Sequence, residues 1–154
     1  MASDASNSDR PMTLPHPHAT LVKFGYPHNL VHEGRHWAVL VRPQQPTLGS
    51  LVLCATGEAT AYGDLPAQAF AEQGELVARI EAMLTRAVGY ARINYLMLMM
   101  VDPHVHFHVI PRYKGERAFG GTVFSDSGWP GPPVLSDTRP ASPELISFLI
   151  SNFS

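Results

Sequence analysis

Three histidines alternate with apolar residues in one short stretch of the chain. His104, His106 and His108 are separated by Val105 and Phe107. Successive side chains of a β-strand point to opposite faces, so a strand here places three imidazoles on one face. Three neighbouring imidazoles repel one another when protonated, and each needs hydrogen-bond partners when buried. A structural role therefore explains them poorly, and the pattern predicts a functional site.

A metal site is one alternative for these histidines. Two adjacent imidazoles can share a zinc ion, but His104 and His108 would lie roughly 13 Å apart along a strand. A metal ion would then need ligands from elsewhere, such as His28, His32, His36 or Asp102. The spacing makes this the weaker interpretation.

Phosphoryl transfer fits the three histidines better. Imidazole is largely neutral at pH 7, since its ordinary pKa is about 6.5, and it can attack phosphorus to form a covalent intermediate. Neighbouring imidazoles can donate hydrogen bonds to phosphate oxygens or protonate a leaving group. His106 lies between the other two and is the predicted nucleophile.

The run from His104 to Ile110, followed by Pro111 and Arg112, resembles the signature of the histidine triad superfamily: three histidines separated by single apolar residues, then two more apolar residues. The preceding sequence is also similar to that family, with an apolar strand, a turn containing prolines, Gly49, a second strand and a long helix. The resemblance covers roughly residues 20–112.

The resemblance implies a small α+β domain, usually a homodimer whose sheet extends across the interface, that hydrolyses or transfers nucleoside monophosphates at the α-phosphate. His106 would be the nucleophile, His108 would contact the phosphate or leaving group, and His104 would support the site. Transferases of the family usually have glutamine in the third position, so His108 favours hydrolysis. Dinucleoside polyphosphates are one typical substrate class. No cofactor is required, although a divalent cation can accompany a polyphosphate.

The sequence also departs from the family pattern. Many hydrolases of the family have a histidine directly after the glycine, where this chain has Ser50. Val41 or Arg42 occupies the place of a ribose-binding acceptor, and neither side chain can accept a hydrogen bond. Residues 99–103 replace a glycine-rich phosphate loop. A non-catalytic nucleotide-binding module is therefore the second hypothesis for this chain.

Four further residues are candidates for substrate binding. Arg42 and Arg112 can supply positive charge to a phosphate, because guanidinium presents a planar fork of donors to oxyanions. Leu40 can line a base pocket, as its counterpart in the family does. Ser50 occupies the family's additional histidine position.

The elements that must position these residues follow from apolar patterning. Strands are predicted at 20–24, 37–41, 49–55, 91–101 and 104–110, and β-rich runs around one helix predict an α+β fold with an antiparallel sheet of about five strands. A long helix is predicted at 66–88, between Pro66 and Gly89, with an apolar stripe centred on Phe70, Val77, Ile80 and Leu84. A short C-terminal helix is predicted from Ser142 to about Ser151.

Length and composition limit the number of domains and the classes of function. The 154 residues fit one domain, divided into a flexible tail at 1–19, the main domain at 20–125, and a C-terminal loop and short helix at 126–154 that pack on it. His16 and His18 fall in the tail and receive no functional role. A net charge of −2 argues against a general nucleic-acid binder but not against a small anionic ligand.

Cysteine content and targeting signals give two more expectations. Cys54 is the one cysteine of the chain, so no intrachain disulfide can form, and its apolar neighbours predict a core position. Neither a signal peptide nor a membrane-spanning segment is indicated, and a cytoplasmic location without membrane attachment is expected.

Overall fold

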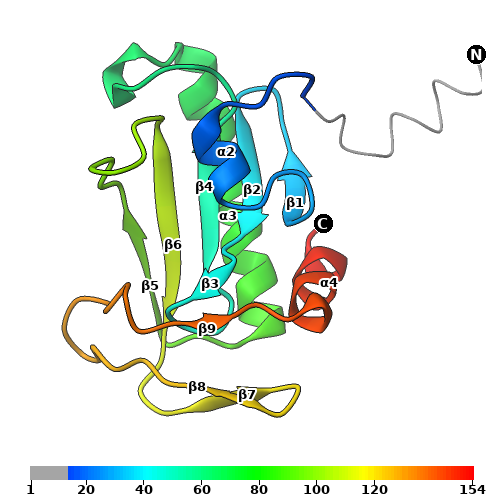
Figure 1. The fold of residues 1–154 in the computed structure, drawn as a ribbon, viewed down its shortest axis with the longest axis vertical. Helices are drawn as coiled ribbons and strands as arrows, with labels where there is room; N and C mark the ends of the chain where they lie inside the picture. Colours follow the sequence, from blue (N-terminus) through cyan, green and yellow to red (C-terminus); the bar gives the residue numbers. More distant parts are fainter. Residues whose placement is uncertain (1–13) are drawn as a thin grey trace, which may run out of the picture.

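A five-stranded antiparallel sheet forms the centre of the computed structural model, which describes residues 14–154 (Figure 1). The predicted tail lies mostly outside the described residues. The strand order is β1-β2-β4-β6-β5, with bounds of Leu30–Glu33 for β1, Trp37–Val41 for β2, Leu51–Ala55 for β4, His106–Arg112 for β6 and Arg92–Leu96 for β5. The predicted α+β class and strand number are confirmed.

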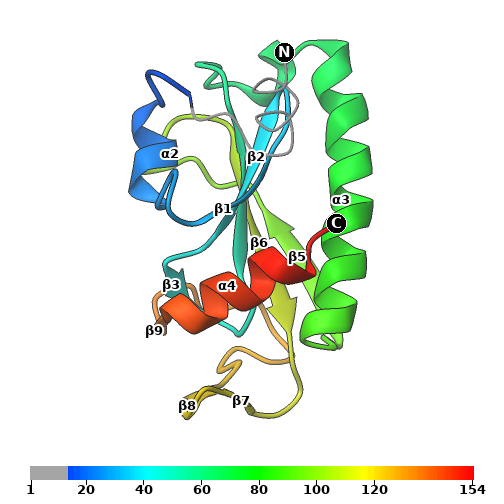
Figure 2. The ribbon, with the colours of Figure 1, turned by 90° about the vertical axis from the view of Figure 1, so that its right-hand side faces the viewer.

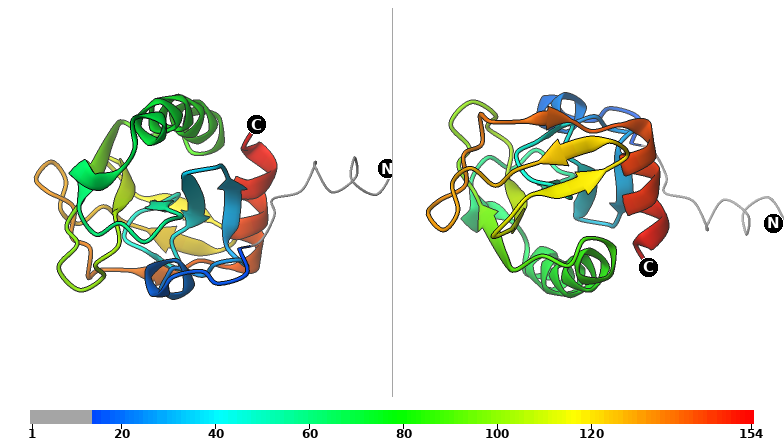
Figure 3. Two further views of the ribbon diagram at one scale, coloured as in Figure 1. Left: turned by 90° about the horizontal axis from the view of Figure 1, so that it is seen from above. Right: turned by 90° about the horizontal axis from the view of Figure 1, so that it is seen from below.

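Both faces of the central strands are covered. Helix α3 (Ala67–Ala87) packs on one face and helix α2 (Ala19–Lys23) on the other, as Figures 2 and 3 show. Every residue of β2 and β4 is buried. Strands that are covered on both faces have apolar residues without alternation, which explains the continuous apolar runs of the sequence.

Helix α3 has nearly the predicted bounds. Pro66 is its N-cap, and Gly89 follows its end with a φ of 58°, a left-handed conformation that suits glycine. The buried stripe lies about one residue away from the predicted one, with Leu76, Ile80, Met83 and Leu84 facing the sheet. Phe70, which the periodicity placed on this stripe, is 39% exposed.

The predicted first strand is wrong. Residues 20–24 lie in and just after helix α2, whose first turn is capped by the His18 side chain accepting a hydrogen bond from the Leu21 N–H. This cap satisfies a backbone donor that a strand would have paired within the sheet. The fifth strand is instead β1, which the sequence analysis did not predict.

The predicted strand at 91–101 is too long. Strand β5 ends at Leu96, which pairs with His108 of β6. Because β5 and β6 are antiparallel neighbours, residues 97–105 are needed to reverse the chain direction. Residues 97–101, the second half of the predicted strand, therefore lie in a loop, and Met100 is 88% exposed.

The C-terminal part of the chain adds two small antiparallel pairs and a helix. Strands β7 (Arg117–Phe119) and β8 (Thr122–Phe124) form a hairpin, and β9 (Arg139–Pro140) pairs with β3 (Gln44–Gln45). A short 3-10 helix, η1, spans Tyr62–Asp64. Helix α4 (Pro143–Asn152) has Ser142 as its N-cap, as predicted, and packs against α3 and β1. Within residues 14–154, the helices are too short or too polar to span a bilayer.

Candidate active site

Strand β6 presents the histidines on the face of the sheet that α2 covers. Val105 and Val109 are fully buried on the opposite face, in the core beneath α3. His106 and His108 point the other way, toward Phe24 of the segment that follows α2. The predicted separation of imidazole and apolar side chains between the two faces is confirmed. His104 lies two residues before β6, because the strand spans His106–Arg112 rather than the predicted 104–110.

The orientation of His106 decides which of its nitrogens can react. Its Nδ1 lies 2.7 Å from the backbone carbonyl oxygen of His104. A carbonyl oxygen only accepts hydrogen bonds, so Nδ1 carries the proton of the neutral ring. The lone pair therefore resides on Nε2, and His106 is held as a nucleophile at that atom.

The contacts of His108 select the other neutral tautomer. The Arg42 Nε–H donates to its Nδ1 at 3.4 Å, so the proton of the neutral ring lies on Nε2. Burial, followed by the charges of Arg42 and His106, lowers the pKa of His108 to about 4. At pH 7 the ring is neutral and can donate one hydrogen bond from Nε2 to an acceptor such as a phosphate oxygen.

His104 is fixed by three neighbours. Its Nδ1 lies 2.9 Å from the Thr20 hydroxyl, and its Nε2 lies 3.4 Å from a carboxylate oxygen of the exposed Glu58. The ring of His18 stacks on it with centroids 3.9 Å apart and 9° between the planes. Because His104 provides the carbonyl that orients His106, these contacts also support the nucleophile.

His18 is a site residue that the sequence analysis missed. Its Nε2 donates to the carbonyl of Ala55 at 2.7 Å, and its Nδ1 caps α2. Burial lowers its pKa, which favours the neutral ring that these two contacts require. The interpretation of residues 1–19 as a flexible tail gave His18 no partner. No local pattern signalled the contact with His104, which lies more than eighty residues away in the sequence.

Two hollows lie near the histidines: His106 and His108 line one of them, and the other is lined by Arg42, which contacts His108. The first, here called the Phe24 hollow, has a volume of about 180 Å³ and is lined by Lys23, Phe24, Arg42, Pro43 and Gln44. The second, called the Met100 hollow, has a volume of about 130 Å³ and is lined by residues 98–102 together with His106 and His108. Lys23 forms an ion pair of 2.8 Å with Asp102, which links α2 to the 97–105 loop.

The structure brings only one of the four substrate-binding candidates to the histidines. Arg42 contacts His108 directly. Leu40 is fully buried in the core beneath α2, and Ser50 is fully buried with its hydroxyl donating to the carbonyl of Thr47 at 2.9 Å. Neither Leu40 nor Ser50 reaches a hollow beside the histidines.

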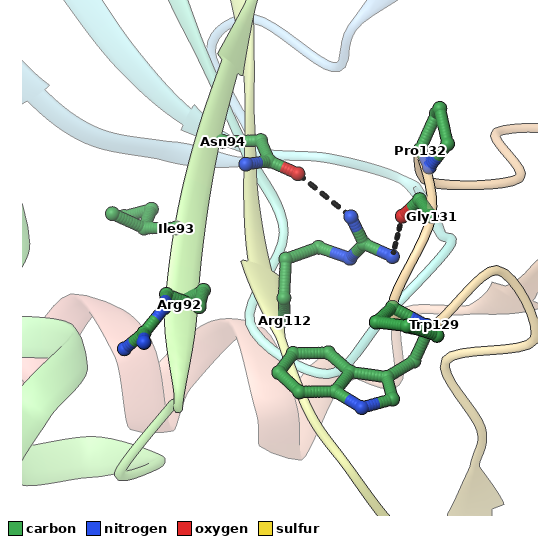
Figure 4. A pocket seen from close by; sticks show the side chains of 8 residues that line it. Arg92, Ile93, Asn94, Arg112, Trp129, Gly131 and Pro132 are labelled. Atoms are coloured by element: carbon green, nitrogen blue, oxygen red, sulfur yellow. Dashed lines mark hydrogen bonds between the residues drawn. The ribbon is translucent and has the colours of Figure 1, made fainter.

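Arg112 lies at the other end of β6, four residues and roughly 13 Å from His108 along the strand. Its guanidinium forms a buried pair with Asp126 at 2.7 Å. It also donates to Asn94 and to the carbonyl of Gly131, as Figure 4 shows. These contacts occupy four of its five N–H groups. The separate pocket of about 590 Å³ beside it is also lined by Trp129.

The described residues contain no metal-ligand cluster, and their one cysteine is buried. Across residues 14–154, no group of three or more His, Cys, Asp or Glu side chains is arranged to hold a metal ion. Cys54 is buried in the core beneath α2, as predicted, and burial raises the pKa of its thiol. A buried thiol with a raised pKa is a poor nucleophile at pH 7.

Solved structures of histidine triad proteins have a fold similar to that of this chain. A histidine triad protein from Sinorhizobium meliloti 1021 aligns with a TM-score of 0.69 and 19% identity, covering 90% of this chain and 96% of its own. One from Bradyrhizobium japonicum aligns with a TM-score of 0.65 and 20% identity, covering 90% and 98%. The chain has the histidine triad fold.

The histidine triad fold also includes more distant neighbours. A diadenosine triphosphate hydrolase from Plasmodium falciparum aligns with a TM-score of 0.53 and 15% identity, covering 57% of this chain and 63% of its own. No family model and no curated protein matches the sequence. The histidine pattern of the sequence and the fold therefore both resemble those of histidine triad proteins, although the sequence identity to these structures is low.

Replacement of His18 should destabilise the fold. His18→Ala removes the cap of α2 and leaves the buried Ala55 carbonyl without its donor, so we expect the free energy of unfolding to fall by about 2 kcal/mol in urea denaturation. His18→Asn should recover about half of this loss, because asparagine caps helices well. His16→Ala, at an exposed histidine, is the control. Equal stability of the His16→Ala and His18→Ala proteins would contradict the assigned contacts.

Removal of the Arg42 charge should raise the pKa of His108. Burial is the larger cause of the low pKa, so in Arg42→Met we expect the pKa to rise above about 4 while staying below the ordinary value of about 6.5. NMR titration of the histidine ring protons measures this directly. Arg35→Met, at an exposed arginine, should leave the titration unchanged. An unaltered pKa in Arg42→Met would show that the two side chains do not interact in solution.

Proposed function

We propose that this chain is a cytoplasmic nucleotide hydrolase of the histidine triad type, which cleaves its substrate at the α-phosphate through a nucleotidyl-His106 intermediate. One observation carries the proposal: the hydrogen bond from His106 to the His104 carbonyl leaves the Nε2 lone pair of His106 free beside the Nε2–H of a neutral His108. This pair combines a nucleophile with a donor for a phosphate oxygen.

The proposed reaction has two displacements. In the first, Nε2 of His106 forms a bond to the α-phosphorus while the bond to the leaving group breaks, and the leaving group takes its electron pair and gains a proton from solvent water. In the second, water attacks phosphorus and gives up a proton to the solvent, the bond to Nε2 breaks, and the nucleoside monophosphate leaves. Splitting the hydrolysis in this way replaces one difficult step by two easier ones.

His108 acts in this proposal as a hydrogen-bond donor to the phosphate. The sequence analysis left open whether His108 protonates the leaving group or holds the phosphate. A pKa of about 4 leaves very little imidazolium at pH 7, so the second role is favoured. The positive charge of Arg42 beside it attracts the phosphate, consistent with the predicted role of Arg42 in substrate binding.

The nucleoside is proposed to lie in the Phe24 hollow. The phenyl ring of Phe24 offers a face or edge to a base, and Arg42 lies between this hollow and the histidines. The fold similarity to a diadenosine triphosphate hydrolase supports nucleotides as the substrate class. Dinucleoside polyphosphates stay a predicted group of substrates, and no cofactor enters the proposed steps.

A homodimer is also proposed. Strand β5 is at the edge of the sheet and pairs only with β6 among the described residues, so its other edge offers backbone groups to a second copy. The family resemblance implies a sheet continued across such an interface. Sedimentation velocity should give the mass of two chains, and a monomer at micromolar concentration would contradict this part of the proposal.

Turnover measurements test the function. The purified protein should release a nucleoside monophosphate from at least one of three substrate groups: dinucleoside polyphosphates, nucleoside phosphoramidates and nucleotide sugars. His106→Ala should lower kcat by at least about a thousandfold, because the covalent route is lost. His28→Ala, at an exposed histidine, is the matched control.

The alternative hypothesis gives a different result in the same experiment. A non-catalytic nucleotide-binding module would bind nucleotides with the same affinity in the wild type and in His106→Ala, and neither protein would turn over any substrate. Thermal unfolding of both proteins checks that the variant is folded.

A further inference from the structure

A separate pocket of about 590 Å³ lies between strands β5 and β6 and residues 129–132 (Figure 4). It is here called the Trp129 pocket. Its volume falls within the range of small-molecule sites, which is roughly 300–1,000 Å³. The proposed hydrolysis takes place at the other end of β6 and gives this pocket no role.

The polar side chains that line the Trp129 pocket offer hydrogen-bond donors. Oδ1 of Asn94 accepts from Nη1 of Arg112 at 2.7 Å, which leaves the amide hydrogens of Asn94 as donors. Arg112 is only 4% exposed, and one of its five N–H groups has no partner among residues 14–154. The lining includes no carboxylate. A ligand bound here must therefore supply the acceptors.

The charges beside the pocket sum to one positive charge. Arg92 and Arg112 are directly opposite each other on β5 and β6, so they share one face of the sheet. Arg112 is paired with Asp126 at 2.7 Å. Arg92 is exposed, and its guanidinium donates to the carbonyl of the adjacent Ala91 at 3.2 Å. Figure 4 shows this guanidinium turned away from that of Arg112. An anion between the two arginines would offset their repulsion.

Trp129 gives the pocket an aromatic wall. The other tryptophan, Trp37, is fully buried and donates its indole N–H to the carbonyl of Ala69 at 2.7 Å. Trp129 is half-buried and belongs neither to the core beneath α3 nor to that beneath α2. A large aromatic ring outside the core, beside a pocket, offers a stacking surface to a planar ligand.

We propose that the Trp129 pocket is a second ligand site of this protein and binds a planar aromatic carboxylate. The ring of the ligand lies against Trp129, and its carboxylate accepts from Asn94 and Arg112 and pairs with Arg92. A carboxylate carries the single negative charge that Arg92 requires, and it matches the planar fork of a guanidinium. The site uses the face of β5, whereas the proposed homodimer uses its backbone edge. The inference does not depend on the proposed function.

Binding of 2-naphthoate and of its neutral amide, 2-naphthamide, tests the inference. The chain has two tryptophans, so the indole N–H signal of Trp129 can be followed by NMR with that of Trp37 as an internal control. We expect 2-naphthoate to shift the Trp129 signal and to leave the ring signals of His106 and His108 in place. It should bind at least about tenfold more tightly than 2-naphthamide, because the amide lacks the negative charge.

Variants separate the recognition of charge from that of the ring. Arg92→Met should weaken 2-naphthoate binding at least about fivefold and leave 2-naphthamide binding unchanged, because it removes the unpaired cation alone. Trp129→Leu should weaken the binding of both probes alike, measured by naphthalene fluorescence. Arg35→Met, at an exposed arginine near the opposite edge of the sheet, is the matched control.

Three results would overturn the inference. The first is equal binding of the acid and the amide, and the second is a shift of the histidine signals in place of the Trp129 signal. The third is tighter binding of 2-naphthyl phosphate than of 2-naphthoate, because the site would then recognise phosphate monoesters. If the wild type binds no probe and Arg92→Met changes the sedimenting mass, the pocket is a contact between copies, which also contradicts the inference. Turnover and its dependence on His106 are measured separately, so the proposed function stands or fails independently.

Discussion

The hydrogen bond from Nδ1 of His106 to the backbone carbonyl of His104 is the contact on which the site depends. A neutral imidazole has one lone pair, and a fixed acceptor at one nitrogen places that lone pair on the other. A backbone carbonyl does not titrate, whereas a carboxylate partner would. The acceptor that holds the proton of the neutral ring on Nδ1 is therefore the same at every pH. The position of the carbonyl depends in turn on His104, whose ring is held by Thr20 and His18.

Burial on both faces of the sheet gives the site its electrostatic character. Helix α2 and Phe24 cover the histidine face, while α3 covers the other. Removing the rings of His108 and His18 from water disfavours their charged forms, and this burial is the largest cause of the lowered pKa of each. A neutral His108 can lie next to His106 and Arg42 without the repulsion that an imidazolium ion there would produce. The same layers that form the core therefore also favour the neutral forms of His18 and His108.

The sequence was sufficient to predict features that depend on short-range patterns. The alternation around His106 identified strand β6 and its two faces. Pro66 and Gly89 marked the two ends of helix α3 closely. Features that depend on contacts between distant segments were missed. Residues 20–24 have β-prone side chains, but His18 caps a helix there and packs against His104. Arg112 follows the signature directly, yet its charge is bound by Asp126 from the C-terminal loop. Only the three-dimensional arrangement distinguishes Arg42, which contacts the site, from Arg112, which does not.

The stereochemical course at phosphorus tests the central claim most directly. A substrate whose α-phosphorus is made chiral by isotopic or sulfur substitution is hydrolysed in labelled water, and the configuration of the released monophosphate is determined by ³¹P NMR. Attack by His106 followed by attack by water inverts phosphorus twice, so the account predicts overall retention. Overall inversion would mean that water displaces the leaving group directly, and it would contradict the role of His106 as the nucleophile.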